Sequence, residues 1–268
     1  MSLALLAGLG AVAGAGVAGA AGYTLRQLTR HPGYAGVPVF RYYLVGPPRP
    51  GSVLNEVRVP LSQFEAQIRH IARRGFRPVT VAEATAKRGD KAFLASKPVV
   101  ITFDGPGEAF YLSAFPVLYR YDMLPVTLYF PAAILGQTEL VLQDGRPEPI
   151  LKTEQLIELC ENGVQLGLLT GELPGASTSE LADALKTLRA ELDELGDAPV
   201  EHLALPLTEP DADAMKAARL AGFSTAAIVG GGGTYTAQSD PFAMPRFPVK
   251  SGMHLVQVAY CLARRRTY

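Results

Sequence analysis

Apolar runs of strand length alternate with helical patterns through most of this chain. The strongest strand candidate is the run PVVITF at 98–103, which is apolar enough to be buried on both faces of a sheet. A helix is predicted over 61–74, where apolar residues recur at helical spacing between Pro60 and Gly75. Strands separated by helices of this length predict parallel βαβ units, either closed as a barrel or open and doubly wound. The sequence therefore predicts an α/β fold.

The other elements follow from the same patterns. Further strands are expected at 37–45, 79–81, 126–130, 164–168, 202–206 and 225–229, and further helices at 108–121, 153–162, 211–221 and 253–264. A capping box at Ser177–Glu180, followed by leucines at helical spacing from Leu181 to Leu195, predicts another helix that packs on the core. The polar segment 136–149 is expected to be an insertion loop.

The first residues of the chain form a separate segment. Residues 2–22 carry no charge and consist almost entirely of Ala, Gly, Leu and Val, and about 20 such residues cross the hydrocarbon core of a bilayer as a helix. Gly10 and Gly14 have the spacing that lets a second helix approach closely in lipid. A cleaved signal peptide is the alternative, but no Lys or Arg precedes the apolar run. We expect an N-terminal transmembrane anchor over residues 1–24 and a globular domain over 36–268.

Charge and composition exclude several kinds of site. The chain has 25 Lys and Arg against 25 Asp and Glu, so it has no basic footprint for nucleic acid. It has 2 Cys and 4 His, with no two histidines at helical ligand spacing, which argues against a cysteine-rich or histidine-rich metal site. The sequence leaves open whether Cys160 and Cys261 pair.

Polar side chains follow two of the predicted strands. In parallel α/β folds the catalytic groups gather at the carboxyl ends of the strands. Asp104 follows the strand at 98–103, and Glu172 comes shortly after the strand at 164–168. These two residues could meet as paired carboxylates for acid–base chemistry. In the simpler interpretation, Asp104 caps a turn or a helix and Glu172 is solvated.

Several stretches together resemble a known family. They are KPVVITFDGPGEAF at 97–110, AFPVLYRYDMLPVTLYFPAAILG at 114–136, ARLAGFSTAAIVGGGG at 218–233 and DPFAMPRFPV at 240–249. In these stretches and in the order of its elements, the chain resembles the polysaccharide deacetylases over about residues 36–262. That family consists of zinc-dependent esterases that remove N- or O-acetyl groups from cell-surface glycans. The resemblance implies an irregular (β/α) barrel behind the N-terminal helix.

The positions that carry the family's chemistry have changed. The first family motif is Thr-Phe-Asp-Asp-Gly, in which the first Asp is the general base and the second ligates zinc. The resemblance therefore places Asp104 at the base position and Gly105 at the ligand position. The second motif, His-Thr-x-x-His, places Leu169 and Leu173 at the two histidine positions. Gly and Leu have no metal-binding atoms in their side chains, so we expect no zinc and no other cofactor.

Two further motif positions bear on the site. Arg246 matches an arginine that steadies the catalytic aspartate in the family, and we expect it to pair with Asp104. The third motif, which normally ends in an aromatic residue followed by Pro-Tyr-Gly, is present as 205–208 (LPLT), so the tyrosine-rich substrate wall is lost. An early Tyr-His pair of one branch of the family is present as Tyr42-Tyr43.

These changes favour a catalytically inactive, deacetylase-like protein over an enzyme. Our first hypothesis is a membrane-anchored accessory subunit that contacts integral membrane proteins through the Gly/Ala-rich helix. Its globular domain is expected outside the cytoplasm, in the periplasm, although Arg26 and Arg30 favour the cytoplasmic side.

Two alternatives remain open. A glycan-binding pseudoenzyme of the cell envelope would keep an open cleft with exposed aromatic residues, and the candidates are Tyr42, Tyr43 and Tyr111. A cleft plugged by Leu169, Leu173 and Leu207 would argue against it. The third and weakest hypothesis is a metal-independent carbohydrate hydrolase built around Asp104 and Glu172.

Overall fold

The computed structural model describes residues 35–141, 145–171, 177–209 and 211–263. The predicted anchor over 1–24 lies outside these residues. Within the described ranges, every helix is too short or too polar to cross a bilayer.

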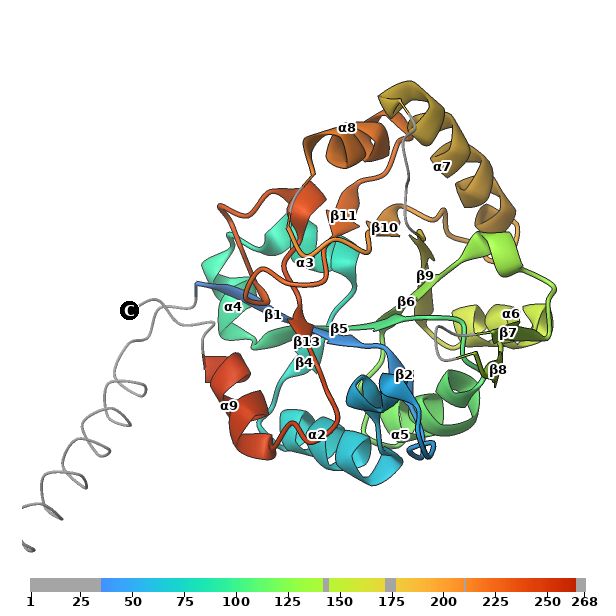
Figure 1. Cartoon of the computed structure of the whole chain (residues 1–268). Coiled ribbons are helices and arrows are strands. Elements are labelled where there is room, and N and C mark those ends of the chain that lie inside the picture. The colour runs from blue at the N-terminus through green and yellow to red at the C-terminus, as the bar shows by residue number, and fades with distance from the viewer. Residues whose placement is uncertain (1–34, 142–144, 172–176, 210, 264–268) are drawn as a thin grey trace, which may run out of the picture.

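A curled, largely parallel sheet forms the centre of the molecule (Figure 1). Its main path is β11-β10-β9-β6-β5-β1-β12, and only β12 runs antiparallel to its neighbour. The strands of this path, in chain order, are β1 (Gly36–Tyr42), β5 (Pro98–Asp104), β6 (Val126–Phe130), β9 (Val164–Leu169), β10 (His202–Ala204), β11 (Thr225–Ala227) and β12 (Thr234–Thr236). The short strand β4 (Arg77–Pro78) pairs with β5, and β13 (Phe247–Pro248) pairs with β1. Two small ribbons lie outside this sheet: β2 (Leu44–Val45) with β3 (Arg58–Val59), and β7 (Glu139–Val141) with β8 (Pro147–Pro149).

Helices surround the curled sheet (Figure 1). The α-helices are α2 (Leu61–Arg73), α3 (Val81–Lys87), α4 (Lys91–Ala95), α5 (Phe115–Arg120), α6 (Thr153–Glu161), α7 (Thr178–Asp193), α8 (Ala212–Leu220) and α9 (Leu255–Ala263). Single turns of other helix types are η1 (Val53–Glu56), the π-helical η2 (Phe110–Ala114), η3 (Ala132–Ile134) and η4 (Pro241–Ala243). The arrangement is an α/β fold with a sheet curled into a half-barrel. Of the two arrangements that the strand and helix pattern allowed, a barrel or an open doubly wound sheet, the structure resembles the barrel.

The two faces of the sheet bury different side chains. Successive residues of a strand point to opposite faces, and on β5 Ile101 belongs to a core cluster shared with α2 and α5–α9, whereas Val100 belongs to a second cluster shared with α3 and α4. Asp104 has the same parity as Val100. It therefore projects from the end of β5 on the face that buries Val100, opposite the face that packs on α2 and α5–α9.

Most predicted elements are observed with small shifts in their bounds. The strand at 126–130 is confirmed without change, and the helix at 61–74 is present as α2. The capping box before α7 is also confirmed, because the side chains of Ser177 and Glu180 each accept a hydrogen bond from the other residue's backbone nitrogen. Leu185 and Leu192 of the predicted apolar face are buried.

Three expectations were wrong in detail. The strand predicted at 79–81 is absent, because Thr80 instead caps α3 by accepting a hydrogen bond from the backbone nitrogen of Glu83, and β4 lies two residues earlier. The helix predicted at 108–121 is divided into the π-turn η2 and α5, with Pro116 in the first turn of α5. The expected insertion loop at 136–149 contains the antiparallel ribbon β7–β8.

Candidate functional site

Asp104 lies at the carboxyl end of the central strand β5, where parallel sheets place their functional groups. Its neighbours across the sheet are β1 and β6. The residue is only 1% exposed. A buried carboxylate is costly unless its charge and its hydrogen bonds are met by partners, so its partners decide what it can do.

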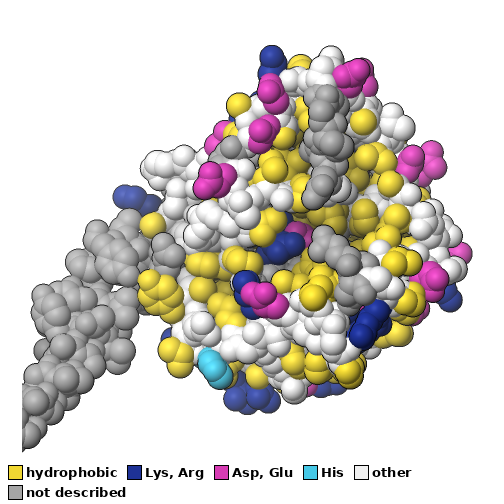
Figure 2. All heavy atoms as spheres, in the orientation of Figure 1, with side chains coloured by type: hydrophobic (Ala, Val, Ile, Leu, Met, Phe, Trp, Pro, Cys, Tyr) yellow, Lys and Arg dark blue, Asp and Glu magenta, His cyan; other side chains and the backbone are white. Residues whose placement is uncertain are grey.

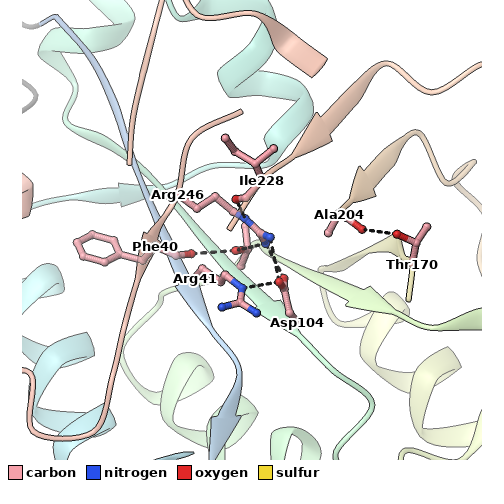
Figure 3. A network of polar contacts seen from close by, with 8 residues as sticks. Phe40, Arg41, Asp104, Thr170, Ala204, Ile228 and Arg246 are labelled. Carbon is pink, nitrogen blue, oxygen red and sulfur yellow. Dashed lines mark hydrogen bonds and ion pairs between the residues drawn. The ribbon is translucent and has the colours of Figure 1, made fainter. Parts of the chain in front are cut away.

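Arg246 is the first partner, and it holds both carboxylate oxygens of Asp104 (Figure 3). Its Nη1 donates to Oδ1 at 2.5 Å and its Nη2 donates to Oδ2 at 2.9 Å. The remaining donor, Nε, is bonded to the carbonyl oxygen of Ile228 at 2.9 Å, and Nη1 also lies 3.3 Å from Oγ1 of Thr102. The Arg246 side chain is fully buried. The structure thus places Arg246 where the sequence expected it, in a two-point ion pair with Asp104.

Arg41 is a second partner that the sequence analysis missed. It projects from β1, and its Nε donates to Oδ2 of Asp104 at 2.5 Å (Figure 3). Its guanidinium also lies 5.6 Å from the ring centre of Tyr43. A signal for Arg41 was present, because it is the only charged residue in the apolar run 37–45. What the sequence did not reveal is that β1 pairs with β5 and so brings Arg41 beside Asp104.

Two opposed effects set the pKa of Asp104. Burial by itself would raise the pKa of this carboxyl group, but the charges of Arg246 and Arg41 and their hydrogen bonds together outweigh it and hold the pKa below its ordinary value. Asp104 is therefore a carboxylate at neutral pH, with both oxygens engaged. A general base needs an oxygen within reach of the proton that it abstracts, and here both oxygens already accept hydrogen bonds from arginine.

The residues present do not fit the zinc ion that the family resemblance implies. Gly105 has no side chain, and its φ of +134° lies in a region that L-residues rarely adopt, so an aspartate ligand there would be strained. Leu169 packs against the core cluster that contains Val100, and its side chain has no atom that can bind a metal. Two guanidinium groups already stand beside Asp104, and their positive charge opposes a metal cation. Among the described residues, no group of three His, Cys, Asp or Glu side chains is close enough to hold a metal.

Two predicted site residues, Leu173 and Glu172, lie outside the described residues. Cys160 and Cys261 do not form a disulfide with each other. Burial, and to a smaller extent the charge of Glu161, raises the pKa of the Cys160 thiol to about 11, so that thiol is not an activated nucleophile.

The three tyrosines that were candidates for glycan binding differ in burial and in hydrogen bonding. Tyr42 is fully buried, and its hydroxyl donates to the side-chain oxygen of Gln67. Tyr43 is half-buried beside Arg41, and Tyr111 is half-buried with its hydroxyl donating to Glu158 at 2.7 Å. Leu207 is partly buried against the core. Figure 2 shows a hollow on this side of the molecule, with apolar side chains around it and basic side chains inside it.

A second buried carboxylate lies close to the first. Glu148 of β8 receives two hydrogen bonds from Arg58 of β3, at 3.2 and 2.9 Å, and its Oε2 also lies 3.0 Å from Nη1 of Arg49. This cluster ties the β7–β8 ribbon to the β2–β3 ribbon. Burial raises the pKa of Tyr43 above its ordinary value, and charges of both clusters act on it as well.

His202 is the only described histidine that is buried, and it lines the inside of the curl at the start of β10. Its Nδ1 lies 3.0 Å from Oγ1 of Thr225, while its Nε2 has no hydrogen-bond partner among the described residues. Burial lowers the pKa of His202 to about 4, so the ring is neutral at pH 7. No carboxylate of the residues that the structure describes is hydrogen-bonded or ion-paired to His202, which argues against a catalytic dyad there.

Comparison with known proteins gives one curated relative and several solved structures. No family model matches the chain. The chain is 24% identical over 226 residues to YxkH of Bacillus subtilis (strain 168), whose name places it among the polysaccharide deacetylases. The match covers 82% of this chain and 73% of YxkH.

The solved structures share the fold. BC0361, a polysaccharide deacetylase from Bacillus cereus, superposes with a TM-score of 0.71 and 20% identity, over 85% of this chain and 69% of that one. The Streptococcus pyogenes deacetylase PplD, solved in complex with acetate, gives 0.74 and 18%, over 85% and 99% of the two chains. IcaB from Ammonifex degensii gives 0.69 and 20%, over 85% and 97%.

Proposed function

From its polysaccharide deacetylase fold and its sequence resemblance to that family, we propose that this chain is a non-hydrolytic member that serves as an accessory subunit of a membrane-protein complex. The observation that carries the proposal is that Arg41 engages Asp104 in addition to Arg246, which matches the arginine that already steadies the catalytic aspartate in the family. The carboxylate at the family's base position accepts three hydrogen bonds from Arg246 and Arg41. Its lowered pKa and its occupied oxygens make it an ion-pair partner within the fold rather than a proton acceptor.

The accessory role is supported by the sequence outside this cluster. The segment 2–22 has the length and composition of a membrane helix, and Gly10 and Gly14 suit close packing with another helix. In this proposal the globular domain lies in the periplasm and presents the strand ends as an interaction surface. Leu169 and Leu207, which stand in place of family motif residues, make that surface more apolar than a catalytic cleft.

The accessory role is tested by purifying the full chain in mild detergent and identifying co-purifying proteins by mass spectrometry. The expected result is an integral membrane protein in stoichiometric amount. The double substitution Gly10→Leu and Gly14→Leu should reduce its recovery, because larger side chains hold two helices apart. A chain that purifies alone from native membranes would argue against the accessory role.

Glycan binding without hydrolysis is the second candidate. It is favoured by the hollow over the strand ends (Figure 2). The partly exposed Arg41, which packs against the ring of Tyr43 beside Asp104, also favours it. The burial of Tyr42 removes one of the three tyrosines that such a site could use.

A further inference from the structure

Arg41 has donors that the protein does not use. Only its Nε is bonded to Asp104, and its two terminal nitrogens have no hydrogen-bond partner among the described residues. The side chain is 14% exposed. Its terminal nitrogens are not among the atoms that are buried without a hydrogen-bond partner, so they are not enclosed in the core. These nitrogens therefore retain access to solvent, and they point away from Asp104 in Figure 3.

The surroundings of Arg41 carry an excess of positive charge. Arg41 and Arg246 face the single carboxylate of Asp104, so the cluster is left with one net positive charge. The neighbouring cluster also has two arginines for one carboxylate, because Arg49 and Arg58 both pair with Glu148. The whole chain has no net charge, so this concentration of basic groups is a local property of the site.

The geometry of Arg41 suits one kind of ligand atom. A guanidinium with two free nitrogens in one plane matches the two oxygens of a carboxylate or a phosphate group. The side chain is also held in place, by its Nε bond to Asp104 and by the ring of Tyr43. A preordered donor loses less entropy when a ligand binds.

We propose that the mouth of the half-barrel beside Asp104 binds an oxyanion, a carboxylate or phosphate group carried by a saccharide, through the terminal nitrogens of Arg41. The inference rests on the proposed non-hydrolytic function, because a free catalytic base would not be paired with this arginine. Tyr43 supplies a half-buried aromatic ring beside the bound group, which is the kind of surface on which a sugar ring stacks.

Isothermal titration of the full chain with three probes tests the proposal. The probes are inorganic phosphate, a galacturonate oligomer and a neutral N-acetylglucosamine oligomer of the same length. We expect the wild-type chain to bind at least one of the two anionic probes and to bind the neutral oligomer more weakly. The probe that binds more tightly identifies whether a phosphate or a carboxylate is the recognised group.

Substitutions of Arg41 separate charge from geometry. Arg41→Gln should weaken binding of the anionic probe by about tenfold or more, since it removes the charge-assisted hydrogen bonds to the bound group. Arg41→Lys keeps the charge but loses the planar pair of donors, so its affinity should lie between the other two. Arg120→Gln, which removes a cation from the exposed surface of α5, is the matched control and should bind like the wild type.

Three results would overturn the proposal. They are failure of the wild-type chain to bind either anion, equal affinity of Arg41→Gln and the wild type, and equal affinity for the neutral and the anionic oligomers. Each variant is checked for cooperative urea unfolding, so that a loss of binding is not a loss of the fold. Zinc-dependent acetate release would instead contradict the proposed function and would leave the measured anion affinity unchanged, so the two failures are distinguishable.

Discussion

Asp104 and Glu148 are two buried carboxylates that the chain holds in the same way. Each faces two arginines, one in a two-point contact that is almost completely buried and one in a single contact nearer the surface. Glu148 lies in an insertion ribbon and joins two parts of the fold. Asp104 occupies the position of the general base in the family that the chain resembles. The comparison teaches that the carboxylate at the family's base position is held by arginines in the same way as a carboxylate that joins two parts of the fold.

The outer arginines of the two clusters differ. Nη1 of Arg49 also donates to the carbonyl oxygen of Pro147 at 2.8 Å, so a hydrogen bond within the protein uses this donor. The terminal nitrogens of Arg41 have no such partner among the described residues. The outer arginine of the Glu148 cluster is therefore bonded within the protein, whereas the outer arginine of the Asp104 cluster keeps donors that can meet a ligand.

The largest effect is expected from Arg246→Met. This change leaves Asp104 buried with only the single contact of Arg41, and breaking a buried ion pair costs about 3–5 kcal/mol. The free energy of unfolding from urea denaturation measures it. Arg219→Met, which breaks an exposed pair with Asp240, is the control and should cost less than about 1 kcal/mol. Equal losses in the two variants would show that Asp104 does not depend on its buried partner.

The pH dependence of stability separates the contribution of Asp104 from that of His202. Because the pKa of His202 is lowered to about 4, the unfolded chain binds more protons than the folded chain between the ordinary value of 6.5 and pH 4. Stability should fall by about 3 kcal/mol as the pH is lowered through this window, and His202→Gln should remove that loss. The contribution of Asp104 is present above its unfolded pKa, near 3.9, and is lost only as the pH falls further, through its lowered folded value. Urea unfolding at a series of pH values measures both, and an identical pH profile in His202→Gln would contradict the assignment.

Glu148→Gln tests whether the second cluster is equivalent to the first. The change leaves Arg58 buried without a counter-ion, but Arg49 is about one-third exposed and can be hydrated. The expected loss of unfolding free energy is about 2–3 kcal/mol, between the cost of an unsatisfied hydrogen-bonding group and that of an unpaired buried charge. Anion binding at Arg41 should persist in this variant. If binding were lost as well, the two clusters would act as one unit.

Arg41→Gln should have the smallest effect on stability. Asp104 keeps both contacts with Arg246, and Arg41 reaches solvent, so we expect a loss of about 1 kcal/mol in urea unfolding. The same variant is expected to lose most of its affinity for anions. A stability loss as large as that of Arg246→Met would make Arg41 a structural residue and would remove the contrast with Arg49.

The sequence was sufficient for the fold and for part of the site. The runs at 98–103 and 126–130 are buried on both faces of the sheet, so their continuous apolar composition and short length identified them as strands. Asp104 and Arg246 were found through the family motifs. Arg41 was not found, because strand order is a non-local property and a single sequence does not show that β1 pairs with β5. The strand expected at 79–81 failed for a local reason, since the Thr80 cap favours a helix start over the β propensity of its valine neighbours.

The central claim is that Asp104 no longer serves as the base of a hydrolytic site. The most direct measurement is the release of acetate from acetylated glucosamine oligomers by the full chain, with zinc added and with a chelator added. The account predicts no release above the background without protein under either condition. Acetate release that requires zinc and stops on chelation would contradict it.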